Sequence, residues 1–155
     1  MRKYYMSNLT CELPDGRILY RVIANRDFGN VKKGTAGGFI GDTRNLSQDG
    51  DCWVADDAAV YGAACVSANA WVGGKATIKG RALITDSASV LEDALIDEYA
   101  FIGGHARIKG ETQIGGKSLI TGRACITGTA CFYDQIFSGD QYVTTRDGFL
   151  HVSTY

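Results

Sequence analysis

The chain has little of several residue types on which common folds and sites depend. It contains one proline, two histidines and two methionines in 155 residues, and its 16 basic and 17 acidic side chains nearly cancel. Because the basic residues are scattered among acids, the sequence lacks the basic stripe of a nucleic-acid-binding protein. No apolar run is long enough to span a membrane, and the amino terminus lacks the apolar core of a signal peptide. We therefore expect one cytoplasmic domain with neither a nucleic-acid nor a membrane partner.

The cysteines do not form a disulfide or metal framework. Their number is odd, no two are spaced as CxxC, and they stand at Cys11, Cys52, Cys65, Cys125 and Cys131. A disulfide scaffold needs pairs, and a structural zinc site needs closely spaced ligands. We therefore expect reduced thiols that pack as small hydrophobic side chains, with no metal.

What the chain does have is a period of six. An aliphatic or aromatic residue recurs without insertion at Val54, Val60, Val66, Val72, Ile78, Ile84, Val90, Ile96, Ile102, Ile108, Ile114, Ile120, Ile126 and Phe132. Two positions before most of these stands a small residue, usually Ala, and two positions after most of them stands Gly or an acid. Six is not a helical period, so the pattern predicts a repeat architecture.

Each unit reads as a short strand with one buried face. Residues alternate small-in, variable-out, aliphatic-in, variable-out, and a turn opened by Gly or an acid follows. Glycine supplies the positive φ that a sharp corner needs. A single unit of this kind cannot bury its aliphatic residue alone, so the units must stack into a solenoid.

This pattern resembles the hexapeptide-repeat family of left-handed parallel β-helices. The resemblance implies an all-β fold in which three hexads make one triangular coil of eighteen residues. Coils would then stack at about 4.8 Å, the spacing of neighbouring strands.

The sequence outside the repeat predicts a cap at each end. Residues 1–30 contain β-prone runs at 4–11 and 17–23 around a Pro-Asp-Gly turn, which predicts a hairpin. Residues 31–53 form an irregular first coil, residues 54–132 the regular repeat, and residues 133–155 a second hairpin of 141–145 and 149–153 joined by Arg-Asp-Gly. Hairpins at these places would cover the open ends of the solenoid.

The irregular segment also carries a resemblance of its own. Its sequence, RDFGNVKKGTAGGFIGDTRNLSQDGDCWV, resembles the segment that precedes the hexads in repeat proteins of bacteriophages and prophages. The resemblance implies an accessory protein of the phage type that acts in the cytoplasm of a bacterial host.

Sorting outward residues by the eighteen-residue coil places apolar side chains in one column. This column consists of Cys65, Leu83, Phe101 and Leu119. A continuous apolar patch of this kind usually marks an interface. Because hexapeptide-repeat proteins typically form trimers, we expect these four residues to line the contacts of a homotrimer. On another face Trp53 and Trp71 lie one coil apart, which we interpret as packing against the cap rather than a ligand platform.

The corners beside the apolar column hold the candidate ligand-binding residues. One corner stacks Arg81, Tyr99 and Lys117, and the other stacks His105 and Arg123 with Arg107 nearby. Guanidinium groups match phosphate oxygens and an aromatic ring can stack on a base, so these residues suit an anionic, nucleotide-like ligand. The alternative is that charges on solenoid corners only keep the protein in solution.

Catalysis has little support in the residues. The family also contains γ-class carbonic anhydrases, which need three histidines, whereas this chain has only His105 and His151. It further contains acyltransferases, which use a histidine base beside an inserted loop; here His105 lies in an uninterrupted hexad.

Three functions therefore stay open. We favour a non-enzymatic protein that sequesters a nucleotide-like ligand in clefts between subunits and so counters bacterial immune signalling. The alternatives are an inhibitor or adaptor that binds a host protein through a solenoid face, and an acyltransferase. No cofactor is expected.

Overall fold

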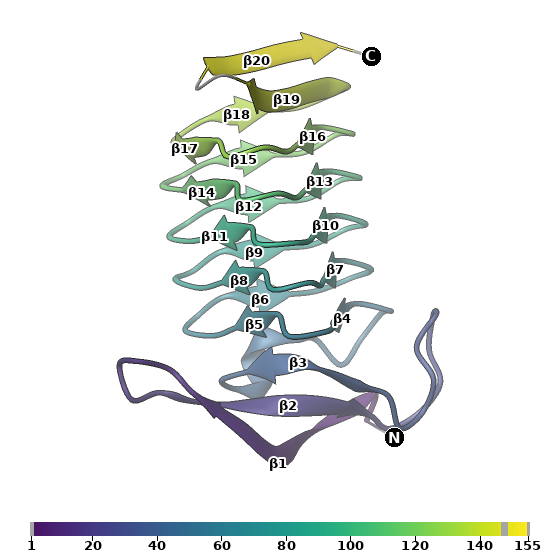
Figure 1. Ribbon diagram of the computed structural model, residues 1–155. Helices are drawn as coiled ribbons and strands as arrows, with labels where there is room; N and C mark the ends of the chain where they lie inside the picture. Colours follow the sequence, from purple (N-terminus) through teal and green to yellow (C-terminus); the bar gives the residue numbers. More distant parts are fainter. Residues whose placement is uncertain (1, 147–148, 155) are drawn as a thin grey trace.

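The computed structural model, in which residues 2–146 and 149–154 are described, is a parallel β-solenoid of stacked three-sided coils (Figure 1). In Figure 1 the chain crosses the front from right to left, returns behind and rises with each coil, a left-handed course. Within the described residues the only helical segment is one 3-10 turn, η1 (Thr43–Asn45). The predicted all-β solenoid of hexapeptide coils with hairpins at its ends is confirmed.

Three sheets run along the solenoid, one on each side. The eight-stranded sheet contains, in spatial order, β1 (Tyr4–Glu12), β2 (Ile18–Ala24), β3 (Ala36–Ile40), β5 (Ala59–Val60), β8 (Thr77–Ile78), β11 (Leu95–Ile96), β14 (Gln113–Gly115) and β17 (Cys131–Tyr133). The seven-stranded sheet contains β4 (Trp53–Val54), β7 (Trp71–Val72), β10 (Ser89–Val90), β13 (Arg107–Ile108), β16 (Cys125–Ile126), β19 (Gln141–Arg146) and β20 (Phe149–Thr154). The five-stranded sheet contains β6 (Cys65–Val66), β9 (Leu83–Ile84), β12 (Phe101–Ile102), β15 (Leu119–Ile120) and β18 (Ile136–Phe137).

The core follows directly from the register. In the five-stranded sheet Ile102 pairs with Ile84 on one side and Ile120 on the other, and all three are fully buried. The small residues two positions earlier are buried as well, because they face the same interior. Each coil therefore packs its aliphatic residues on copies of themselves, which no single hexad could do.

Acids replace glycine at the corners for a reason that the structure shows. Asp56 and Asp86 adopt left-handed φ angles of 55° and 56°. Their carboxylates accept hydrogen bonds from the backbone N–H of Gly74 and Gly104, one coil further on, both at 2.8 Å. The acid thus satisfies a corner N–H of the next coil, which offsets part of the cost of its own backbone conformation.

The amino-terminal hairpin packs on the first coil. Trp53 is 1% exposed and lies edge-on to the rings of Phe28 and Tyr4, with centroids 5.3 and 6.4 Å away. Trp71 pairs with Trp53 in the adjacent strand and is half-buried. The interpretation of this tryptophan pair as cap packing is confirmed for Trp53.

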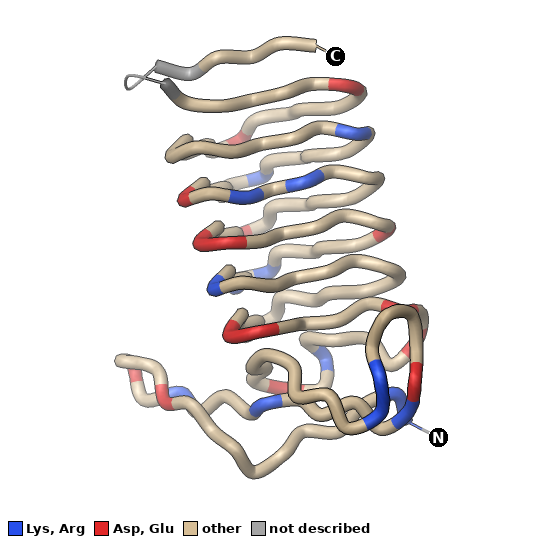
Figure 2. Tube along the Cα trace, turned by 45° about the vertical axis from the view of Figure 1, so that its right-hand side comes forward, with Lys and Arg blue, Asp and Glu red and all other residues tan. Residues whose placement is uncertain are grey.

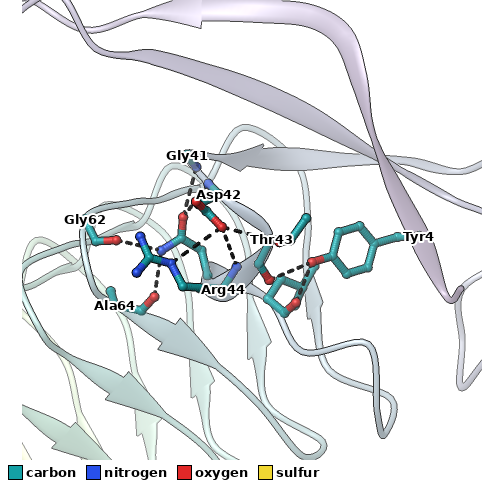
Figure 3. A network of polar contacts seen from close by, with 9 residues as sticks. Tyr4, Gly41, Asp42, Thr43, Arg44, Gly62 and Ala64 are labelled. Carbon is teal, nitrogen blue, oxygen red and sulfur yellow. Dashed lines mark hydrogen bonds and ion pairs between the residues drawn. The ribbon is translucent and has the colours of Figure 1, made fainter.

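Two buried polar side chains stabilise the irregular first coil through hydrogen bonds to its backbone. Asn45, with no exposed surface, donates to the carbonyls of Gly62 and Ala64 at 3.1 and 2.7 Å and accepts from the N–H of Gly41 and Asp42. Figure 3 labels these four partners.

Lys3 is the second of these side chains, and it is equally buried. Its ammonium donates to three backbone carbonyls, the shortest bond being 2.8 Å to Cys52. Burial raises the pKa of the Cys52 thiol, whose sulfur lies 3.2 Å from the same ammonium. These contacts stabilise the first coil, in which the six-residue spacing is interrupted.

The stacking continues beyond Phe132, the end of the regular repeat. Ile136 pairs with Leu119 and Tyr142 with Cys125, a shift of seventeen residues instead of eighteen. The last coil is therefore one residue short, and the rings of Phe132 and Phe137 meet edge-on at 5.2 Å to close the core. Strands β19 and β20 form the second predicted hairpin; the residues at its turn, 147–148, lie outside the described residues.

Charge is mixed over the whole solenoid. Figure 2 shows Lys and Arg interspersed with Asp and Glu along the coils, without a continuous basic stripe in the part of the chain that is described. No helix among the described residues is long and apolar enough to cross a membrane.

Candidate functional site

The six predicted ligand-binding residues lie on two different edges of the solenoid. Arg81, Tyr99 and Lys117 follow strands of the eight-stranded sheet, at its corner with the five-stranded sheet. His105 and Arg123 lie at the next corner, between the five- and seven-stranded sheets, and Arg107 begins β13. The eighteen-residue register therefore divides them as the sequence predicts.

The predicted residues of the first corner differ in their contacts. The Arg81 guanidinium lies over the Tyr99 ring at 5.6 Å. An open recess of about 420 Å³ beside Arg81 also contains Lys79, whose ammonium is 3.8 Å from the Asp97 carboxylate. Lys117 is exposed, and its backbone N–H donates to Asp134 at 2.7 Å.

The second corner brings three of the predicted residues together. His105, Arg107 and Arg123 line one recess of about 540 Å³ with two residues that sequence reasoning did not assign to the site, Cys125 and Tyr142. Arg107, Cys125 and Tyr142 occupy the same position on β13, β16 and β19, so their side chains form one outward column. His105 and Arg123 flank this column from the corner. We call this recess the cationic recess.

One cation of this recess already has a carboxylate partner. The Arg123 fork donates to both oxygens of Asp140, from Nε at 2.8 Å and from a terminal nitrogen at 2.9 Å. These hydrogen bonds hold the pKa of Asp140 below its usual range. Because the pair lies on the surface, water screens it. An incoming anion would therefore compete with Asp140 for the Arg123 fork.

A second recess adjoins the first at Tyr142. It measures about 410 Å³ and is lined by Tyr142, Thr144, His151, Val152 and Ser153 of the β19–β20 hairpin. We call it the hairpin recess. His151, distant from the hexads in sequence, thus lies beside the column that contains Arg107. The seventeen-residue step of the last coil hid this relation, because an exact eighteen-residue register places Tyr142 opposite the inward Ala124 instead of Cys125.

The predicted interface residues form a column along the five-stranded sheet. Cys65 pairs with Leu83, Leu83 with Phe101 and Phe101 with Leu119. Ile136 extends the column and is 68% exposed. Burial raises the pKa of the Cys65 thiol, which keeps this end of the column uncharged. Leu119 is 37% exposed, so much of the column's upper part faces solvent.

Over residues 2–146 and 149–154, no group of three His, Cys, Asp or Glu side chains is placed to hold an ion. What the two recesses offer is cationic, hydroxyl, imidazole and aromatic groups, which bind anions and flat rings.

Part of the chain is similar to a known protein. A segment of 53 residues is 43% identical to part of an Escherichia coli (strain K12) protein named "Uncharacterized acetyltransferase YdcK". The match spans 34% of this chain and 16% of that protein. No protein-family model matches the chain. This likeness covers too little of the relative to carry its activity over.

Proposed function

We propose that this chain is a non-enzymatic binding protein that sequesters a small anionic, nucleotide-like ligand. The observation that carries the proposal is the convergence of His105, Arg107 and Arg123 on one recess with the ring of Tyr142. Its volume of about 540 Å³ falls within the range of small-molecule sites. Arg107 and His105 supply hydrogen-bond donors for phosphate oxygens.

Ligand retention and charge reversal test this proposal. Native mass spectrometry of protein purified from bacteria should detect a bound nucleotide that denaturation releases. Arg107→Glu should abolish retention, because it places a carboxylate at the anion site. Lys75→Glu makes the same charge change at an exposed corner outside the recess and should leave retention intact. Equal loss in both variants, or none in Arg107→Glu, would contradict the proposal.

We further propose that the protein works as a homotrimer whose contacts are made by Cys65, Leu83, Phe101 and Leu119. The column lies next to the corner of His105 and Arg123, so a neighbouring subunit would border the cationic recess. Phe101→Asp should dissociate the oligomer in sedimentation velocity. Leu95→Asp, a matched change at a half-buried outward position of the eight-stranded sheet, should not.

The resemblance of the first coil to phage and prophage proteins favours a biological role in counter-defence. In that role the protein would act in the host cytoplasm and remove a nucleotide signal of bacterial immunity. Expression in a host with nucleotide-dependent immunity should restore phage plaques, and Arg107→Glu should not.

Acyl transfer is the second candidate, and the partial likeness to the E. coli protein favours it. In this reading the cationic recess would bind the phosphates of an acyl-coenzyme A and His105 would be the base. Release of coenzyme A from acetyl-coenzyme A in the presence of amine acceptors, lost in His105→Ala, would support the enzyme over the binding protein.

A further inference from the structure

The hairpin recess differs in chemistry from the cationic recess that it adjoins. Thr144 and His151 pair across β19 and β20, and so do Tyr142 and Ser153. Among the residues whose side chains are described, its lining therefore presents two aliphatic hydroxyls, a phenol and an imidazole, and no Lys or Arg. Such groups hydrogen-bond to neutral polar atoms, for example sugar hydroxyls and the edge of a base.

Tyr142 stands between the two recesses and lines both. Its side chain is 38% exposed, so part of the ring is open to a ligand. An aromatic ring in this position favours a flat, unsaturated ring over a sugar or an aliphatic chain, because the two faces stack. The order along the surface is thus cations, then an aromatic ring, then hydroxyls and imidazole.

We propose that the two recesses are halves of one site for a nucleoside phosphate. Phosphate oxygens bind at Arg107 and His105, the base stacks on Tyr142, and the sugar or base edge meets Thr144 and His151. This inference rests on the proposed function and assigns it a substrate class. The carboxy-terminal hairpin is then a part of the binding site as well as a cap, and it distinguishes nucleotides from other phosphates.

Paired calorimetric titrations test the inference with ADP, GDP, CDP and UDP against inorganic pyrophosphate. All five probes carry two linked phosphoryl groups, and only four carry a base and a sugar. The wild-type chain should bind at least one nucleoside diphosphate about tenfold more tightly than pyrophosphate, the effect expected of one base–aromatic stack. Tyr142→Leu should remove this preference and leave pyrophosphate affinity unchanged. Tyr142→Phe keeps the ring and should retain the preference.

Each other outcome has a definite meaning. Pyrophosphate binding as tightly as every nucleotide overturns the inference and leaves an anion site in place. Equal weakening of all probes by Tyr142→Leu also overturns it, because the ring would then only support the fold. Failure of all five probes to bind the wild-type chain overturns the proposed function and the inference together. Selective loss of nucleotide affinity in His151→Gln would support the hairpin half of the site.

Discussion

The middle coils and the last coil are built from the same kind of repeat but have different roles. From β5 to β15 every step is eighteen residues, and inward positions are aliphatic or small. In the last coil the step falls to seventeen, and the chain runs from the solenoid into the β19–β20 hairpin. The two recesses that share Tyr142 lie at this departure. Regular coils supply stability, and the irregular coil supplies the concave surface that a ligand needs.

The amino-terminal end departs from the repeat in another way. Lys3 and Asn45 are fully buried polar residues that bond to backbone groups of the first coil. No buried side-chain nitrogen or oxygen among the described residues lacks a hydrogen-bond partner. This irregular end thus replaces lost strand pairing with side-chain bonds and closes the core.

The largest expected effect is in the middle coils. Ile102→Ala removes a fully buried side chain between two identical neighbours and should lower the free energy of unfolding by about 2–5 kcal/mol. Ile102→Val removes a single methylene and should cost about 0.5–1.5 kcal/mol. Urea unfolding followed by circular dichroism measures both. Equal costs would show that the stacked core can collapse around the cavity.

Next comes the buried lysine of the irregular first coil. Lys3→Met keeps the aliphatic stem and leaves three carbonyls without their donor. The free energy of unfolding should therefore fall by about 1–3 kcal/mol. The exposed Lys75→Met should change stability by less than about 0.5 kcal/mol. If Lys3→Met were neutral or stabilising, the cost of burying the charge would equal or exceed the gain from its bonds.

Gly74→Ala at a corner should lower the free energy of unfolding by about 1–3 kcal/mol. A Cβ there would lie 2.6 Å from the backbone nitrogen of Glu92, and φ is +62°. Gly16→Ala shares the positive φ, at +89°, but meets no atom within 4 Å. The difference between Gly74→Ala and Gly16→Ala in thermal unfolding isolates the contact with the next coil. A difference of zero would contradict the tight stacking described here.

The smallest effect on stability is expected at Asp140. Its pKa is lower in the folded chain, so the Arg123 pair contributes fully above the unfolded value of about 3.9. That contribution is lost as pH falls through the depressed folded value. Asp140→Asn should therefore reduce the loss of stability between neutral and acid pH. It should also tighten binding of whichever nucleoside diphosphate the wild-type chain binds by about two- to fivefold, because it removes a competitor for Arg123. Weaker binding would show that Asp140 positions the guanidinium instead.

The sequence predicts the repeat well because each hexad contains both the inward residues of its strand and the residue of its corner. The inward residues from Val54 to Phe132 are all buried, and the positive-φ corners in this range fall at Gly or acids except at Ala68. The eighteen-residue coil also predicts that Arg81 and His105 lie at different corners. The features that could not be predicted are those at which the chain departs from this period.

Tyr142 is such an exception, because the single-residue shortening before Ile136 is visible only once Ile136 pairs with Leu119. The Arg123–Asp140 pair depends on the same shift, since Asp140 is seventeen residues from Arg123. The carbonyl partners of the Lys3 ammonium lie 46 to 49 residues away in a coil without a repeat pattern. Contacts of this range leave no local signal in one sequence.

The most direct test of the account uses the only two histidines of the chain, since one lines each recess. NMR spectra of the His105 and His151 imidazoles would be recorded during titration with ADP, GDP, CDP or UDP and, separately, with pyrophosphate. We predict that at least one nucleotide moves both imidazole signals saturably with a single dissociation constant, and that pyrophosphate moves that of His105 alone. Unchanged signals for both histidines with every probe would contradict the anion site and its extension to the hairpin.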